Sequence, residues 1–274
     1  MKRALEAVVL ASLLAAATPA HATPSTTFWT PATTYVQPYL VPHITYDTYV
    51  AQKGLLQNDY GLTVGVLPWE ELQGEVGLDL FLPGGPSLAS GLPHPVSGKG
   101  TQAKDNAYLN AKVGIPENTW SPYMPGVSAG IMSVGFTSDY SNYNHLHAET
   151  GKTFGPVGNF TVGGYYGLNE KLYVSSSGKT ERAGFMASWT SADIKMGLPG
   201  LDKIVFIADY ASGNNAFGAY GGGIGLFFTP AIDILTGPVY LLDKDLYKAN
   251  PMANTNFMWT VQLDVDLEFR KKKS

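Results

Sequence analysis

Phe257-Met258-Trp259-Thr260-Val261-Gln262-Leu263-Asp264-Val265-Asp266-Leu267-Glu268-Phe269 is a run of 13 residues in which apolar and polar side chains alternate. Every odd-numbered position is large and apolar, and from Thr260 onward every even-numbered position is polar or acidic. Because successive side chains of a strand point to opposite faces, the run predicts a strand with one apolar and one polar face. Strands of soluble sheets usually have about 5–6 residues, whereas a tilted strand that crosses a bilayer needs roughly 9–11. The run therefore favours a membrane strand.

The same run resembles the closing strand of bacterial outer-membrane β-barrels, in which alternating apolar residues end in an aromatic residue. The resemblance implies an outer-membrane location in a Gram-negative bacterium and recognition of the strand Phe257–Phe269 by the barrel-insertion machinery. The chain departs from the pattern after Phe269, because Arg270-Lys271-Lys272-Lys273-Ser274 follow where the aromatic residue is usually last. The alternative is an edge strand of a soluble sandwich, but soluble proteins avoid long, flat, apolar edges.

The first 22 residues have the features of a secretory signal peptide. Met1-Lys2-Arg3 is basic, residues 7–17 are apolar, and Ala20-His21-Ala22 is a small-residue cleavage site. The apolar stretch is too short for a membrane-spanning helix. We therefore expect residues 1–22 to be removed and residues 23–274 to form one outer-membrane β-barrel domain.

The composition limits the possible classes of function. The chain has no cysteine, so disulfides cannot hold an exported fold together. A net charge of −4 argues against nucleic acid as a partner. The sequence contains no phosphate loop or nucleotide fingerprint, and we expect no cofactor. The glycines, tyrosines and phenylalanines suit strands and turns with aromatic anchors.

Alternating stretches separated by turn signals recur along the chain and predict an all-β fold. We expect a transmembrane antiparallel up-and-down β-barrel of about 12 strands, an even number as in single-chain bacterial barrels. The predicted strands are 35–50, 60–67, 71–82, 107–115, 126–136, 143–151, 160–168, 182–190, 203–211, 217–228, 231–241 and 257–269. Very short connections at 68–70 and 229–230 contrast with long hydrophilic ones, which is typical of periplasmic turns and external loops. Two aromatic girdles are expected, one of Trp69, Trp120, Phe160, Phe228 and Phe269 and one of Tyr46, Tyr60, Tyr210, Tyr240 and Phe257.

The polar faces of these strands predict a lumen rich in carboxylates. Bare carboxylates cannot lie in lipid, so they require water, a cation or a basic partner. A solvated wall without a specific site and an acidic passage that favours cations or neutral solutes are both compatible with this pattern. The predicted lumen-lining residues are Asp47, Glu71, Glu75, Asp79, Lys112, Glu149, Arg182, Asp209, Asp233, Asp264, Asp266 and Glu268.

His145, His147 and Glu149 form the one constellation with ligand-like spacing. On a strand the three side chains point to one side, about 6.6 Å apart for each two-residue step. Two imidazoles and a carboxylate are a candidate zinc or copper site. No fourth ligand can be identified, and a polar stretch near the external rim is the alternative.

The first strand contains Pro38 and Pro42, which have no amide hydrogen and share one parity. In an antiparallel ladder, amides of one parity point to the same neighbour. We therefore expect the pairing of the first and last strands to begin near His43 and residues 35–42 to be loosely held.

Taken together, these patterns predict a passive channel, or porin, for small solutes with an acidic lumen. The expected partners are the lipid bilayer and small solutes, whereas the solute and the oligomeric state are not indicated. One alternative is a structural or adhesive barrel whose lumen is plugged by its own side chains. A second is an outer-membrane hydrolase of lipase or protease type, but the chain has no H-x-S-N-G-like run, and we expect no enzyme.

Overall fold

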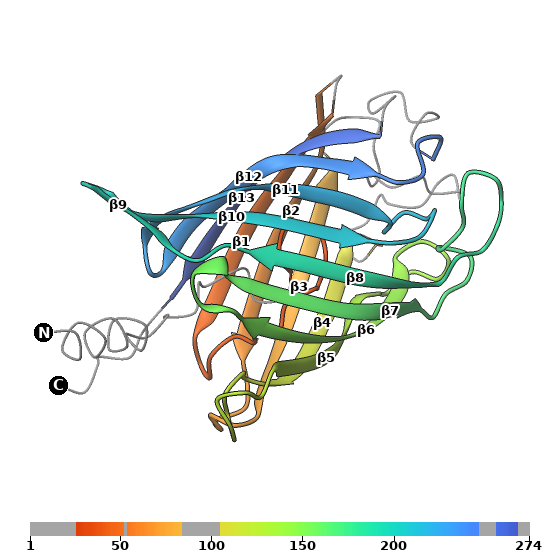
Figure 1. Ribbon diagram of the computed structural model, residues 1–274. Helices are drawn as coiled ribbons and strands as arrows, with labels where there is room; N and C mark the ends of the chain where they lie inside the picture. The colour runs from red at the N-terminus through yellow and green to blue at the C-terminus, as the bar shows by residue number, and fades with distance from the viewer. Residues whose placement is uncertain (1–25, 52–53, 84–104, 247–255, 268–274) are drawn as a thin grey trace, which may run out of the picture.

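Twelve of the 13 strands close into an antiparallel barrel (Figure 1). The structure is a computed structural model that describes residues 26–51, 54–83, 105–246 and 256–267. The strands are β1 (Pro42–Ala51), β2 (Gly54–Gly65), β3 (Gln73–Pro83), β4 (Ala107–Ile115), β5 (Gly126–Gly135), β6 (Asn142–Thr153), β7 (Asn159–Gly167), β8 (Ala183–Thr190), β9 (Ile194–Leu198), β10 (Leu201–Ala211), β11 (Ala219–Thr229), β12 (Ile232–Leu241) and β13 (Phe257–Asp266). The predicted all-β barrel is confirmed. No helix within the described ranges is long and apolar enough to cross a membrane.

Neighbouring strands in the barrel are also neighbours in sequence, except at β9. Strand β8 pairs with the last residues of β10, whereas β9 pairs with its first residues and stands outside the ring (Figure 1). Strand β9, which has only five residues and is mostly exposed, was not predicted. The signal peptide proposed for residues 1–22 lies outside the described residues.

The barrel closes where β1 meets β13, and this pairing runs from His43 opposite Asp266 to Ala51 opposite Met258. The prediction that the paired seam starts near His43 is confirmed. The predicted start of the first strand at residue 35 is wrong, because β1 begins at Pro42. Leu40 has a φ of +58°, which lies outside the regular strand region, and its amide donates to the Gly65 carbonyl oxygen. The chain before Pro42 therefore leaves the wall and enters the barrel.

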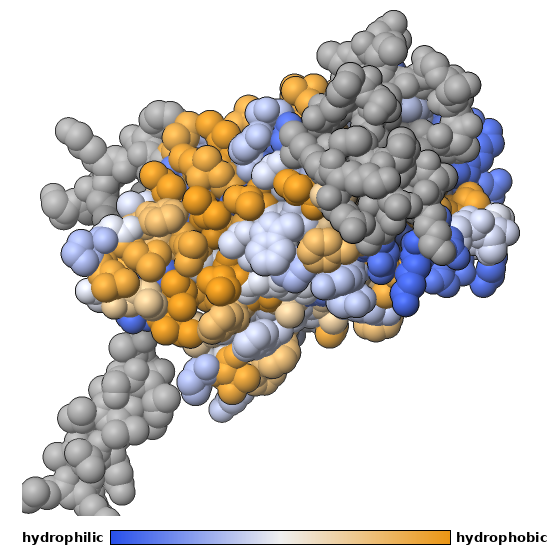
Figure 2. Space-filling view, turned by 90° about the horizontal axis from the view of Figure 1, so that it is seen from above, coloured by the Kyte–Doolittle hydropathy of each residue, from blue (hydrophilic) through white to orange (hydrophobic). Residues whose placement is uncertain are grey.

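The outer surface of the barrel is apolar and the inner surface is not. In β13, Trp259, Val261 and Leu263 are 36–44% exposed, whereas Thr260, Gln262 and Asp264 are at most 1% exposed. Large apolar side chains are exposed on the other strands in the same way, and Figure 2 shows them spread over the wall, with hydrophilic residues gathered at one end. An apolar surface of this extent, wrapped around a closed barrel, faces lipid.

On the outer surface, aromatic rings from each of the two predicted girdles contact neighbouring rings at the same end of the barrel. Tyr46 lies 5.0 Å from Tyr60, and Tyr240 lies 5.2 Å from both Tyr220 and Phe257, measured between ring centroids. Toward the other end, Phe160 contacts Phe154 and Trp189. Phe269 lies outside the described residues.

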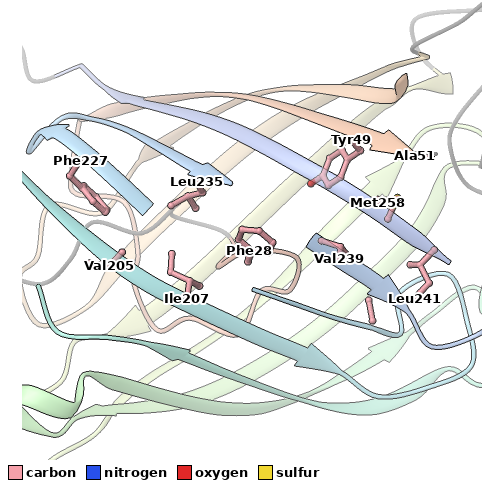
Figure 3. Close-up of a cluster of buried hydrophobic side chains, with 11 residues drawn as sticks. Phe28, Tyr49, Ala51, Val205, Ile207, Phe227, Leu235, Val239, Leu241 and Met258 are labelled. Atoms are coloured by element: carbon pink, nitrogen blue, oxygen red, sulfur yellow. The ribbon is translucent and has the colours of Figure 1, made fainter. Parts of the chain in front are cut away.

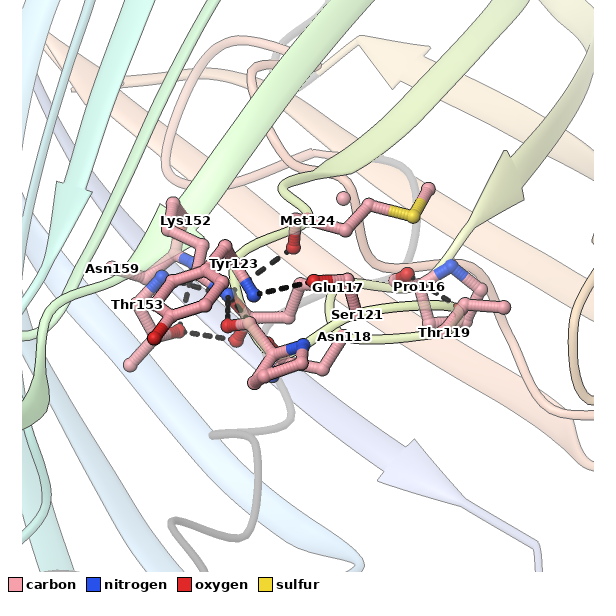
Figure 4. Close-up of polar contacts among 12 residues, drawn as sticks. Pro116, Glu117, Asn118, Thr119, Ser121, Tyr123, Met124, Lys152, Thr153 and Asn159 are labelled. Atoms are coloured by element: carbon pink, nitrogen blue, oxygen red, sulfur yellow. Dashed lines mark hydrogen bonds and ion pairs between the residues drawn. The ribbon is translucent and has the colours of Figure 1, made fainter.

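The two ends of the barrel differ in their connections. An even number of antiparallel strands places the start of β1 and the end of β13 at one end, here called the turn end. At this end the connection 116–125 is fixed to the end of β6 (Figure 4). Lys152 Nζ donates to the Pro122 and Met124 carbonyl oxygens, and the Glu117 carboxylate accepts from the backbone and hydroxyl of Thr153. The opposite end, here called the loop end, carries the connections 168–182 and 212–218.

Candidate functional site

Residues 26–41, here called the inner segment, lie inside the barrel. Phe28, Ala32, Val36 and Gln37 are at most 1% exposed although none of them belongs to a strand. The contacts of the segment follow the wall from β10 near the loop end to β2 at the turn end. The segment therefore occupies much of the space that an open channel would leave to water.

One carboxylate holds the start of the inner segment. Asp209 Oδ2, on β10, accepts from the backbone amides of Phe28, Trp29 and Thr30 at 3.2, 2.7 and 2.7 Å. The hydroxyl of Thr27 donates to the same oxygen at 2.8 Å. Successive amides that converge on one oxygen form an anion-binding concavity, which suits an ionised carboxylate. We call this group of contacts the Asp209 latch.

Further along, polar side chains of the wall bind the backbone of the inner segment. The Ser188 hydroxyl donates to the carbonyl oxygen of Ala32, and the Ser128 hydroxyl lies 3.2 Å from the carbonyl oxygen of Thr33. The amide of Gln37 donates to Glu75 Oε2 at 2.6 Å, and its side chain donates to Asp266 Oδ1 at 2.8 Å. These bonds satisfy buried backbone groups that a ladder does not pair.

At the turn end the inner segment passes very close to a glycine of β2. A Cβ atom on Gly65 would lie 2.2 Å from the Pro38 carbonyl oxygen, a distance that no real contact reaches. Tyr39 forms an isolated bridge to Gly65. The glycine lets two backbones meet where a side chain would keep them apart.

Phe28 packs on an apolar part of the inner wall (Figure 3). Val205, Ile207, Leu235 and Val239, from β10 and β12, are at most 3% exposed and form a buried cluster with it. The inward faces of β10 and β12 are therefore apolar over part of their length, which the prediction of a uniformly polar lumen did not include.

Most predicted lumen residues are buried on the inward face. Asp47, Glu75, Lys112, Glu149, Asp209, Asp233 and Asp264 are between 1% and 8% exposed. Asp79 and Asp266 are half-buried; the side-chain amide of Asn110 donates to Asp79 Oδ2 at 2.5 Å. His43 lies between two of them, with Nε2 3.1 Å from Asp264 Oδ1 and Nδ1 2.8 Å from Asp266 Oδ1.

Three predicted residues do not lie on the described inner wall. Glu71 is exposed in the connection before β3, because the strand begins only at Gln73. The guanidinium carbon of Arg182 lies 5.0 Å from the ring centroid of Tyr166, an exposed residue, so stacking draws it away from the lumen. Glu268 lies outside the described residues.

Two buried charged residues on the strands of the wall were missed, Asp59 at 8% and Lys203 at 5% exposure. Asp59 directly precedes the predicted strand 60–67 and has the parity of its polar face, so the alternation already contained the signal. Lys203 Nζ lies 3.0 Å from Asp193 Oδ1 and 4.5 Å from the centroid of the Phe227 ring. Its position at the first residue of a predicted strand gave no indication of either partner.

A cavity of about 160 Å³ remains between the inner segment and the wall of β1–β6. Asp47, Asp59 and Asp79 line it from three consecutive strands. Aromatic rings complete its wall, among them Trp29 of the inner segment and Phe217 of the loop end. Because His43 and Thr63 also line it, the cavity extends from near the turn-end limits of β1 and β2 to Phe217 at the loop end.

His145, His147 and Glu149 all face inward from β6, as the parity predicts, and each is at most 7% exposed. Their contacts differ: Nδ1 of His145 lies 2.8 Å from the hydroxyl of Tyr173, whereas Nδ1 of His147 lies 2.6 Å from Glu149 Oε1. Over the described residues, no group of three or more His, Cys, Asp or Glu side chains is arranged to hold a metal ion. The metal site stays a prediction from spacing.

A serine also belongs to this group, and its bonding bears on nucleophilic chemistry. Ser128 Oγ donates to Glu149 Oε2 at 2.8 Å, so the hydroxyl contacts the carboxylate and not the imidazole. A catalytic triad requires the reverse order, with the imidazole between the two. The group therefore lacks the nucleophile–base contact that acyl transfer needs.

At the loop end, carboxylates bind the connections together. Asp243 accepts from the amide and hydroxyl of Ser176 at 2.6 and 2.7 Å and from the amides of Asp245 and Leu246. Desolvation would raise the pKa of Asp243, but these hydrogen bonds outweigh it and the pKa is lowered. The ionised carboxylate therefore stabilises the contact between connection 168–182 and residues 243–246.

The closed ring, the lipid-facing apolar surface and the polar inner wall define a porin-like outer-membrane β-barrel. No protein-family model matches the chain, and no curated protein matches it. Among solved structures, the NanC porin gives a TM-score of 0.47 at 10% identity, over 83% of this chain and 99% of that one. An outer membrane channel from Pseudomonas putida F1 gives 0.42 at 10% identity, over 84% and 96%. The outer membrane phospholipase A from Escherichia coli gives 0.43 at 11% identity, over 84% and 93%.

Proposed function

We propose that the protein is an outer-membrane channel for small solutes and that the inner segment closes it in the state described. The observation that carries the proposal is a set of five buried carboxylates on the inner wall that are incompletely hydrogen-bonded. Asp47, Asp59, Asp209, Asp233 and Asp264 each keep one oxygen without a hydrogen-bond partner among the described residues. An unpartnered buried carboxylate oxygen is costly, so a lumen filled only for stability would not carry five of them. Water and cations in an open lumen would satisfy these oxygens.

The attachment of the inner segment fits a removable closure. Its contacts with the wall are hydrogen bonds that use at least one side chain, the packing of Phe28 and the bridge at Gly65. The ladders that close the barrel, including β1 with β13, use none of these groups. The segment can therefore leave the lumen while the twelve-stranded ring remains closed.

The charges of the inner wall favour cations or neutral solutes over anions. Of the cationic groups that face inward, Lys112 lies 3.6 Å from Glu75 and Lys203 lies beside Asp193. Asp47, Asp59 and Asp79 line the cavity without such a partner. Rings of carboxylates are the usual basis of cation preference in channels.

Reconstitution into planar bilayers tests the proposal. In a potassium chloride gradient we expect rare openings of the wild-type protein, a reversal potential on the cation side, and more frequent openings of D209N, in which the latch is weakened. D79N should reduce the cation preference, whereas E71Q, at an exposed carboxylate of the turn end, should not. Silence of both wild type and D209N would instead support the structural or adhesive barrel.

A further inference from the structure

Two carboxylates in the cavity oppose each other across neighbouring strands. Asp47 of β1 and Asp59 of β2 are direct cross-strand partners, and both are 8% exposed. Oδ1 of each lacks a hydrogen-bond partner among the described residues. Like charges in directly opposed positions destabilise a sheet, and buried charges require a partner. The pair therefore calls for a cation in the adjacent space.

Aromatic rings surround the same space. Trp29 and Tyr49 pack edge to face with centroids 5.7 Å apart, and Phe81 and Tyr108 do so at 5.1 Å. All four line the cavity that Asp47 and Asp59 line. The electron-rich faces of such rings attract organic cations. The rings are independent of the acidic pair, since they come from the inner segment, β1, β3 and β4.

The size and the ligand atoms of the cavity restrict the cation. A cavity of about 150 Å³ accommodates benzene, and this one has a volume of about 160 Å³. Metal ions prefer several convergent carboxylate, imidazole or carbonyl ligands. Within the described part of the chain no cluster of three His, Cys, Asp or Glu has that arrangement. Carboxylates on one side and rings on the others suit an ammonium group that carries small alkyl substituents.

We propose that this cavity binds a small organic cation of the ammonium class, with Asp47 and Asp59 as its counter-charges and the four rings as its walls. The inference deepens the proposed function, because it names a substrate class for the channel and a binding site between the inner segment and the wall of β1–β6. Asp79, whose Oδ2 already accepts from Asn110, adds charge at the edge of the site.

Calorimetric titration of the purified full chain in detergent tests the site. The probes are choline and 3,3-dimethylbutan-1-ol, which has the same shape without the charge. We expect choline to bind and the alcohol to bind at least about tenfold more weakly, because hydrogen bonds and ion pairs with a charged group exceed neutral contacts. D47N/D59N should weaken choline binding at least about tenfold. D233N, which neutralises a buried inward carboxylate outside the cavity, should leave it within about twofold.

Three other results of the titration would each overturn the proposal. Equal binding of choline and the alcohol would identify an apolar pocket, and no binding of choline would mean that Asp47 and Asp59 share a proton. If calcium chloride or potassium chloride binds to the wild-type protein but not to D47N/D59N, and choline does not bind, the cavity is a metal site. The comparison of the two probes uses the wild-type protein, so it holds even if the double variant fails to fold. Because calorimetry does not require conduction, choline binding by a silent barrel would refute the channel and keep the site.

Discussion

The Asp209 latch offers the sharpest test of how the inner segment is held. Asp209 Oδ2 accepts four hydrogen bonds from residues 27–30, three of them from backbone amides. The substitution D209N keeps the shape and one acceptor oxygen but removes the charge. Hydrogen bonds to charged groups contribute about 1.5–3 kcal/mol and neutral ones about 0.5–1.5, so each bond loses roughly 1 kcal/mol.

Four bonds to one atom are not independent, and about 2 kcal/mol is a conservative estimate for the total loss. That loss corresponds to a roughly 30-fold increase in the population of the released segment. Amide hydrogen exchange in detergent measures this population directly, because the amides of Phe28, Trp29 and Thr30 exchange only when the latch opens.

We expect the exchange of these three amides to accelerate about 30-fold in D209N, while amides in the middle of β3 remain unchanged. D233N is the matched control, since Asp233 is equally buried and has no contact with the inner segment among the described hydrogen bonds. Equal protection of residues 28–30 in D209N and wild type would show that the latch does not hold the segment.

Three further predictions concern the wall, the turn end and the loop end. V261R places a charge on the lipid-facing side of β13, and it should lower the free energy of unfolding in bilayers by about 2–4 kcal/mol, as measured by urea titration; an unchanged value would contradict the lipid-facing assignment. G65A should displace the inner segment and lower the denaturation midpoint, whereas G164A, whose Cβ would meet only ordinary contacts, should not; equal midpoints would mean that the close approach is not required. The lowered pKa of Asp243 means that the contact with Ser176 is fully present above the ordinary carboxyl pKa and is lost as the pH falls through the lower value in the folded protein. The protection factor of the Ser176 amide, which is its exchange rate relative to the intrinsic rate at the same pH, should therefore fall at acidic pH in wild type but be low at every pH in D243N.

The sequence predicted the wall of the barrel well because the wall is a local pattern. In strands such as β3 and β13, successive side chains point to the lipid and to the lumen in turn. The alternation in the sequence therefore indicates the face on which each side chain lies. The same parity placed Asp47 and Asp264 inside. Closure followed from the even number of strands and the alternation of short and long connections.

The contents of the lumen could not be predicted in the same way. Residues 35–42 continue the apolar spacing of β1. Pro38 and Pro42 indicated that pairing starts near His43, but nothing local indicated that the chain before it lies inside the barrel. The entry into the barrel depends on contacts distant in sequence, such as Gln37 with Glu75 and Thr27 with Asp209. The cavity depends in turn on that path, because Trp29 forms part of its wall. From the sequence, the carboxylates that the strands contribute to the candidate site could therefore be predicted, whereas the contribution of the inner segment could not.

The account rests on the claim that the inner segment closes a channel, and a reversible crosslink measures this directly. The chain has no cysteine, so T27C/D209C introduces the only two thiols, at positions whose side chains are in hydrogen-bond contact. A short bismethanethiosulfonate reagent joins them, a reductant separates them, and mass spectrometry verifies both states. The removal of Asp209 also abolishes the latch, so the reduced protein is the released form.

Single-channel conductance in planar bilayers is then recorded before and after reduction. The account predicts a crosslinked protein that rarely conducts, a reduced protein that conducts with cation preference, and a return to the closed level when the crosslink is formed again. Equal conductance in the two verified states, or silence in both, would contradict it.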